Sequence, residues 1–148
     1  DLACGLHPLA LPWLPLAPGA RYHACDIYAE MMTFIGAFLP LAGVRGRATT
    51  CDVTQAVPPG PVDFAFLLKA IPCLEQLDRD AGRHLLADTP ARWLVVSFPS
   101  QSLGGRHKGM PAFYEAHFNE LVAGKDWAIR RLTFSTELVF VIDTRRQL

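Results

Sequence analysis

The stretch of residues 62–68 constrains the fold more than any other part of the chain, because it is apolar at every position except Asp63. A strand with apolar side chains on both sides fits the middle of a parallel sheet, where both faces are buried. Residues 93–98 form a second run of this kind. Elsewhere, as in residues 27–39, apolar side chains recur at helical spacing. This alternation predicts a doubly wound α/β fold.

The rest of the pattern extends this prediction along the chain. We predict strands at residues 21–25, 47–51, 62–69, 93–98, 127–134 and 137–142, helices at 27–39, 74–86 and 111–123, and a short or irregular helix at 9–16. Only Ser135-Thr136 separates the last two strands, which predicts a terminal hairpin. The fold class is therefore a Rossmann-like sheet that is mostly parallel and has an antiparallel last strand.

The first eight residues read as the turn that leaves the first strand of a nucleotide-binding unit. Gly5 follows an acidic and a small residue and precedes an apolar segment. Glycine lets a backbone pass close to a ligand. No second glycine occurs before Gly19, so the three-glycine fingerprint of a dinucleotide site is absent. Dinucleotide binding is disfavoured.

Ligands of such sheets bind at the carboxyl ends of the strands, and Asp1, Asp26, Asp52 and Lys69 all fall there. Asp26, at a corner between strand and helix, is placed to accept hydrogen bonds from a ribose diol. For Asp26 and Asp52 alike, the alternative is a local cap. The charge of Lys69 could orient a phosphate or a polar neighbour, or its side chain could simply extend into solvent.

Composition narrows the class of protein. The 148 residues suit one domain, residues 1–148, with a real core, since 51% are hydrophobic and 19% are charged. No apolar run approaches the length of a membrane span, and no basic signal region precedes the proline-containing segment 9–16, so we expect a cytoplasmic protein. The four cysteines show no C-x-x-C spacing, so no metal site is predicted. Net charge is zero, although residues 101–148 carry 7 basic against 5 acidic residues.

Three motifs carry a more specific resemblance. The pattern D-x-x-C-G-x-x-P at the start resembles motif I of the class I S-adenosylmethionine methyltransferases. Residues 67–75 (LLKAIPCLE) and 98–110 (FPSQSLGGRHKGM) are similar to segments of the aminoglycoside-resistance methyltransferases, and the similarity runs along essentially all 148 residues. That family methylates N7 of guanine 1405 in 16S ribosomal RNA.

The resemblance implies S-adenosylmethionine as the cofactor. By this resemblance, Asp52 takes the position that contacts the adenine amino group in such enzymes, and Val53 could pack on the adenine ring. The cofactor contacts that we expect are Asp1, Ala3, Cys4, Gly5, Asp26, Ile27, Asp52, Val53, Leu68 and Lys69.

The resemblance also implies an RNA partner, the 16S rRNA of the assembled 30S subunit. The expected RNA contacts are Lys69, Arg106, His107, Lys108 and Met110. The basic residues lie between glycines, and arginine can donate two hydrogen bonds to guanine O6 or to a phosphate. Guanine N7 has a lone pair and no proton, so methyl transfer requires positioning rather than a general base. No catalytic residue is predicted, and the five histidines are expected to be structural or to contact RNA.

Relatives in that family have an N-terminal helical domain before motif I, and we expect it, with most of the first strand, to be missing here. A monomer is expected. Two alternatives stay open: a methyltransferase of another substrate, which would need no basic loop, and a fragment that binds cofactor or RNA without turnover. Salt-dependent binding to small ribosomal subunits would favour the rRNA enzyme.

Overall fold

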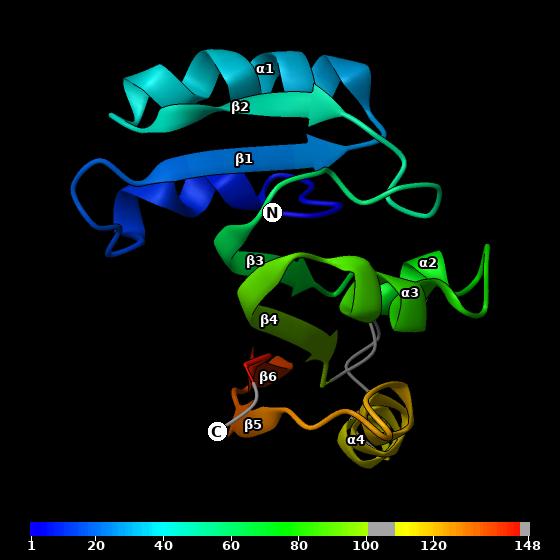
Figure 1. The fold of residues 1–148 in the computed structure, drawn as a ribbon. Helices are drawn as coiled ribbons and strands as arrows, with labels where there is room; N and C mark the ends of the chain where they lie inside the picture. Colours follow the sequence, from blue (N-terminus) through cyan, green and yellow to red (C-terminus); the bar gives the residue numbers. More distant parts are fainter. Residues whose placement is uncertain (101–108, 146–148) are drawn as a thin grey trace. The chain divides into compact units, whose positions relative to one another are not determined.

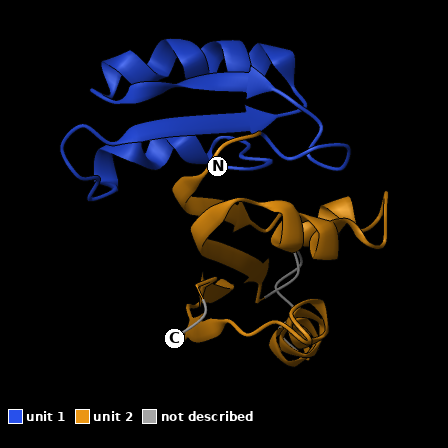
Figure 2. Cartoon of the chain, viewed as in Figure 1, with its two compact units in different colours: residues 1–58 blue, residues 59–148 orange. Residues whose placement is uncertain are grey.

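The computed structural model describes residues 1–100 and 109–145. Within it the chain divides into two compact units, residues 1–58 and residues 59–148 (Figure 2). Each unit contains its own group of hydrogen-bonded strands, two in the first unit and four in the second.

The first unit consists of a short 3-10 helix, two parallel strands and one long helix (Figure 1). Its elements are η1 (His7–Trp13), β1 (Arg21–Asp26), α1 (Ala29–Leu41) and β2 (Arg45–Thr50). The strands β1 and β2 pair in parallel, with Asp26 opposite Thr50. Helix α1 packs on both strands through buried side chains that include Ile35 and Leu39. The predicted helix, strands and irregular helix are confirmed, although α1 begins at Ala29 rather than Ile27.

One glycine is required for the pairing of β1 with β2. Gly46 lies opposite Tyr22, and a Cβ atom at Gly46 would come within 1.7 Å of the Tyr22 carbonyl oxygen. Non-bonded heavy atoms do not approach this closely. Only glycine therefore fits at this position of β2.

The second unit places four strands in the order β3-β4-β6-β5. Its elements are β3 (Val62–Leu68), α2 (Ile71–Leu74), α3 (Ala81–Asp88), β4 (Ala91–Pro99), α4 (Met110–Leu121), β5 (Ala128–Thr133) and β6 (Glu137–Asp143). Strands β3 and β4 are parallel, while β6 is antiparallel to both β4 and β5. Helix α4 packs on β4 and β6, where the rings of Phe118 and Phe140 stack with centroids 3.7 Å apart. The predicted hairpin and the antiparallel last strand are confirmed.

The prediction of one amphipathic helix over residues 74–86 is wrong. The chain forms α2 and α3 instead, with a turn between them. In that turn the Asp78 carboxylate accepts a hydrogen bond from the backbone N–H of Asp80 at 3.0 Å. Aspartate competes in this way for backbone donors and favours turns over helix interiors. Within residues 1–100 and 109–145, no helix is both long and apolar enough to cross a bilayer.

Candidate functional site

The first five residues continue the sheet of the first unit before they turn. The Cys25 N–H donates to the Asp1 carbonyl at 2.9 Å, and the Cys4 N–H donates to the Cys25 carbonyl at 3.1 Å. Leu2 therefore pairs in parallel with Cys25. The chain then leaves the strand direction through two residues in the left-handed region, Ala3 at φ 48° and Gly5 at φ 51°. This is the turn that the sequence predicts beside a ligand.

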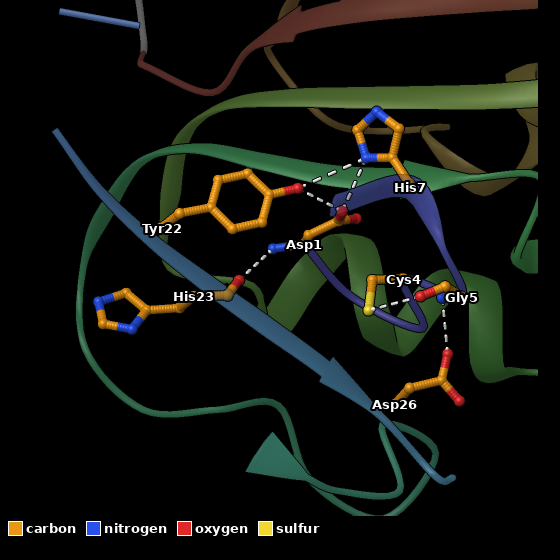
Figure 3. Close-up of polar contacts among 7 residues, drawn as sticks. All are labelled: Asp1, Cys4, Gly5, His7, Tyr22, His23 and Asp26. Carbon is orange, nitrogen blue, oxygen red and sulfur yellow. Dashed lines mark hydrogen bonds and ion pairs between the residues drawn. The ribbon is translucent and has the colours of Figure 1, made fainter. Parts of the chain in front are cut away.

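Asp26 fixes this turn from the end of β1. Its carboxylate oxygen Oδ2 accepts a hydrogen bond from the Gly5 N–H at 2.9 Å (Figure 3). Only 8% of Asp26 is exposed. Helix α1 begins at Ala29 with Tyr28 as N-cap residue and no side-chain cap, so the alternative that Asp26 caps this helix is wrong. The structure brings Gly5 and Asp26 together, as expected of neighbours at one sheet edge.

The Asp1 carboxylate points into the protein. Its side chain is 1% exposed. Oδ2 accepts a hydrogen bond from the Tyr22 hydroxyl at 2.5 Å and lies 2.7 Å from His7 Nδ1 (Figure 3). Burial raises the pKa of Tyr22, so this phenol keeps its proton and remains a donor. Oδ1 is buried without a hydrogen-bond partner among the described residues.

The Asp1 carboxylate thus connects η1 and β1, through its contacts with His7 and Tyr22. Sequence reasoning missed its partners His7 and Tyr22, because no motif links these positions. The expected contact of Asp1 with the cofactor stays a prediction.

Burial favours the protonated form of two thiols in this region, those of Cys4 and Cys25. Cys4 and Cys25 are buried, and all four cysteines are free. Burial, with a smaller contribution from the charge of Asp26, raises the pKa of Cys4 to about 11. Burial and a hydrogen bond with Cys51 raise the pKa of Cys25 to about 12. Among the described residues, no group of three or more His, Cys, Asp or Glu side chains could hold a metal ion.

Asp52 follows β2 and presents a charged carboxylate to solvent. Its Oδ1 accepts hydrogen bonds from the Thr54 hydroxyl at 2.7 Å and from the Thr54 N–H at 2.9 Å. These two hydrogen bonds lower the pKa of Asp52, and the bond from the Thr54 hydroxyl makes the larger contribution. Asp52 therefore closes a local turn, in keeping with the capping alternative, while its side chain stays exposed.

Two apolar residues of the expected site differ in exposure. Val53 is buried. Ile27, directly after Asp26, is 56% exposed and offers an apolar surface beside the turn.

Lys69 lies in the second unit at the carboxyl end of β3. It adopts the left-handed φ of 56°, which is unusual for a residue other than glycine. The strain is compensated by hydrogen bonds from its N–H to the Ser97 carbonyl at 3.0 Å and to the Ser97 hydroxyl at 3.1 Å. Its ammonium group lies 2.9 Å from the Glu137 carboxylate. Leu68, which precedes it, is half-buried.

The Lys69 side chain is thus both half-exposed and ion-paired, which agrees with the expectation of a polar neighbour as well as with that of solvent exposure. Glu137 and Ser97 were missed, because their proximity to Lys69 depends on the strand order of the folded sheet.

The expected RNA contacts Arg106, His107 and Lys108 lie outside the described residues. The described chain resumes at Gly109, which has a left-handed φ of 84° and precedes the first residue of α4, Met110. Met110 is half-buried.

Comparisons with known proteins agree on one family. The family model "Ribosomal RNA methyltransferase (FmrO)" matches residues 1–141. A 16S rRNA (guanine(1405)-N(7))-methyltransferase of Micromonospora rosea is 41% identical over 142 residues, which cover 96% of this chain and 52% of that protein. A protein of the same name from Micromonospora olivasterospora is 45% identical over 144 residues, covering 95% and 48%. The chain spans about half the length of the curated relatives it matches.

Solved structures give the same result. The 16S rRNA methyltransferase RmtF in complex with S-adenosyl-L-homocysteine superimposes with a TM-score of 0.84 at 33% identity, covering 97% of this chain and 54% of that one. The 16S rRNA methylase ArmA gives a TM-score of 0.74 at 29% identity, covering 96% and 71%. A SAM-dependent methyltransferase from Aquifex aeolicus, at 16% identity and a TM-score of 0.69, shares the fold. The chain belongs to the FmrO family of ribosomal RNA methyltransferases.

Proposed function

We propose that residues 1–148 carry the catalytic domain of an S-adenosylmethionine-dependent methyltransferase that modifies N7 of guanine 1405 in 16S rRNA. Family membership and the names of the matched relatives support the reaction and the nucleotide. The observation that carries the proposal is the Gly5–Asp26 hydrogen bond, which holds a left-handed turn against a buried carboxylate at the carboxyl end of β1. This is where α/β sheets bind ligands.

The residues of the first unit fit an adenosine-containing cofactor. The Asp26 carboxylate uses Oδ2 for the Gly5 N–H, and a carboxylate has further acceptor capacity for a ribose diol. Ile27 provides exposed apolar surface, and the charged Asp52 carboxylate can accept a hydrogen bond from an exocyclic amine. When bound, S-adenosylmethionine supplies a methyl group on a sulfonium, which is strongly electrophilic.

Methyl transfer to guanine N7 mainly requires that the protein position the two reactants. Guanine N7 carries a free lone pair, so no side chain has to remove a proton. The raised pKa values of the Cys4 and Cys25 thiols are consistent with this, since the thiolate is the nucleophilic form. The role of the chain is to bind the methyl donor and the RNA in the correct relative position.

We further propose that Lys69, Met110 and the basic segment Arg106 to Lys108 contact the RNA, and that the substrate is the assembled 30S subunit in the cytoplasm, bound by a monomer. The Lys69 ammonium is already placed by Glu137 at the carboxyl end of β3. Replacing phosphate counterions by these cations would make binding fall steeply with salt.

The test is to map methylation on 30S subunits incubated with the protein and S-adenosylmethionine. The proposal expects one new N7-methylguanine, at position 1405, and protection of the subunit from aminoglycosides. Methylation elsewhere in 16S rRNA, or of a small molecule in place of RNA, would contradict the assigned substrate while leaving the cofactor site in place. Failure to bind S-adenosylhomocysteine would contradict both.

A further inference from the structure

Four rings form a continuous series on α4 and β4, from the core of the second unit to its surface. We call Phe98, Tyr114, Phe113 and His117 the aromatic ladder. Phe98, on β4, is fully buried and stacks on Tyr114 with centroids 5.1 Å apart. Tyr114 meets Phe113 edge to face at 5.3 Å. Phe113 also lies nearly parallel to His117, at 14° and 6.4 Å. Yet Phe113 itself is 65% exposed.

The exposed ring of Phe113 contacts His117, which is itself held by a carboxylate. His117 Nε2 lies 2.7 Å from the Glu75 carboxylate, so the ladder is tied to the residue that follows α2. On the same helix, Phe118 stacks on Phe140 of β6. A single exposed apolar side chain needs no explanation. Phe113 differs from such a side chain because it contacts two further rings and is still 65% exposed, and a ring with such support loses less freedom when a partner binds.

The ladder lies at the ligand-binding edge of its sheet. Phe98 is next to the last residue of β4, whose carboxyl end belongs to that edge. The contact of His117 with Glu75 places the ladder close to α2, which follows the carboxyl end of β3. In the sequence, only Gly109 separates the basic segment Arg106 to Lys108 from helix α4.

Single-stranded nucleic acid can place an unstacked base over an exposed aromatic ring while its phosphates pair with cations. We propose that Phe113 is a stacking platform for an unpaired nucleobase of the RNA substrate. This inference rests on the proposed function, in which the substrate is rRNA. It adds an uncharged, base-directed interaction to the charged segment that precedes α4.

The experiment compares Phe113→Ala, Phe113→Leu and Phe113→Trp with a matched control, Phe34→Ala. Phe34 is also a helical phenylalanine, 55% exposed, but it lies on α1 in the first unit. Binding to 30S subunits is measured at several salt concentrations. A short single-stranded RNA that contains 2-aminopurine reports stacking directly, through quenching of its fluorescence.

We expect Phe113→Ala to weaken RNA binding roughly 5- to 150-fold, the range for removing one stacked base. The slope of log affinity against log salt should not change, because the phenylalanine ring carries no charge and neutralises no phosphate. Phe113→Trp should restore both binding and quenching, Phe113→Leu should restore neither, and Phe34→Ala and cofactor binding should be unaffected.

Several results would overturn the inference. Wild-type affinity in Phe113→Ala, full rescue by leucine, or an equal weakening in Phe34→Ala would each remove the stacking role. A dimer that Phe113→Ala converts to a monomer would show that the ring packs against a second copy of the chain. If the wild-type protein methylates 30S subunits but does not quench 2-aminopurine, the inference fails and the proposed function stands. If the wild-type protein quenches 2-aminopurine but does not methylate 30S subunits, the proposed function fails and the stacking role of Phe113 stands.

Discussion

Replacement of Asp26 separates the two roles that the structure and the proposed function give to one carboxylate. In the folded protein it accepts the Gly5 N–H at 2.9 Å. In the proposed complex it also accepts hydrogen bonds from a ribose. Hydrogen bonds to charged groups contribute about 1.5–3 kcal/mol each. Asp26→Ala should therefore lower the free energy of unfolding by about that amount, because it leaves a part-buried N–H without its acceptor.

The same variant should bind S-adenosylhomocysteine about 1.5–3 kcal/mol more weakly, which is roughly 10- to 150-fold in dissociation constant. Asp26→Asn is the matched comparison. Its amide oxygen can still accept the Gly5 N–H, so most of the stability should return, while the NH₂ group replaces one carboxylate oxygen and cofactor affinity should stay low. Denaturant unfolding measures the first quantity and titration calorimetry the second.

The two readouts can refute the two roles independently. Unchanged calorimetric affinity in a folded Asp26→Ala protein would remove Asp26 from the cofactor site. Unchanged unfolding free energy would show that the Gly5 hydrogen bond contributes nothing net. If Asp26→Asn loses as much stability as Asp26→Ala, the charge itself and not the acceptor geometry holds the turn.

Three further predictions test other parts of the chain. Gly46→Ala should prevent β1 and β2 from pairing, since its Cβ would lie 1.7 Å from a carbonyl oxygen, and circular dichroism should show loss of the native fold. The lowered pKa of Asp52 means that its bonds to Thr54 stabilise the fold above the ordinary pKa of 3.8 and that this contribution disappears as pH falls through the folded value. Asp52→Asn should therefore reduce the loss of melting temperature at acid pH, measured in thermal unfolding scans. An unchanged loss would contradict the role given to the Asp52–Thr54 hydrogen bonds. Replacing Arg106 and Lys108 together by Ala should leave cofactor affinity unchanged but abolish methylation, with a salt slope smaller by about one for each phosphate that is no longer neutralised. Normal methylation by this variant would refute their role in RNA binding.

The sequence predicted those features that arise from local periodicity. Continuous apolar runs identified β3 and β4, and the predicted position of Asp26 at the carboxyl end of a strand is confirmed. Long-range pairs such as Lys69 with Glu137 escaped prediction, because they depend on which strands become neighbours. The helix over residues 74–86 failed for a local reason, since aspartate side chains compete for backbone donors and a periodic apolar pattern does not register that competition.

The alternation of side chains along β1 explains how the turn is held at both ends. Residues an even number of positions apart on a strand share a face, so Tyr22 and Asp26 point the same way. Tyr22 binds the carboxylate of Asp1, and Asp26 binds the N–H of Gly5. A left-handed conformation at a residue such as Ala3, where φ is 48°, costs on the order of 1–3 kcal/mol. Two hydrogen bonds to charged groups, one at each end of the turn, can offset that cost. The strained backbone is therefore maintained by the protein itself, and a ligand at this edge would meet a turn that is already formed.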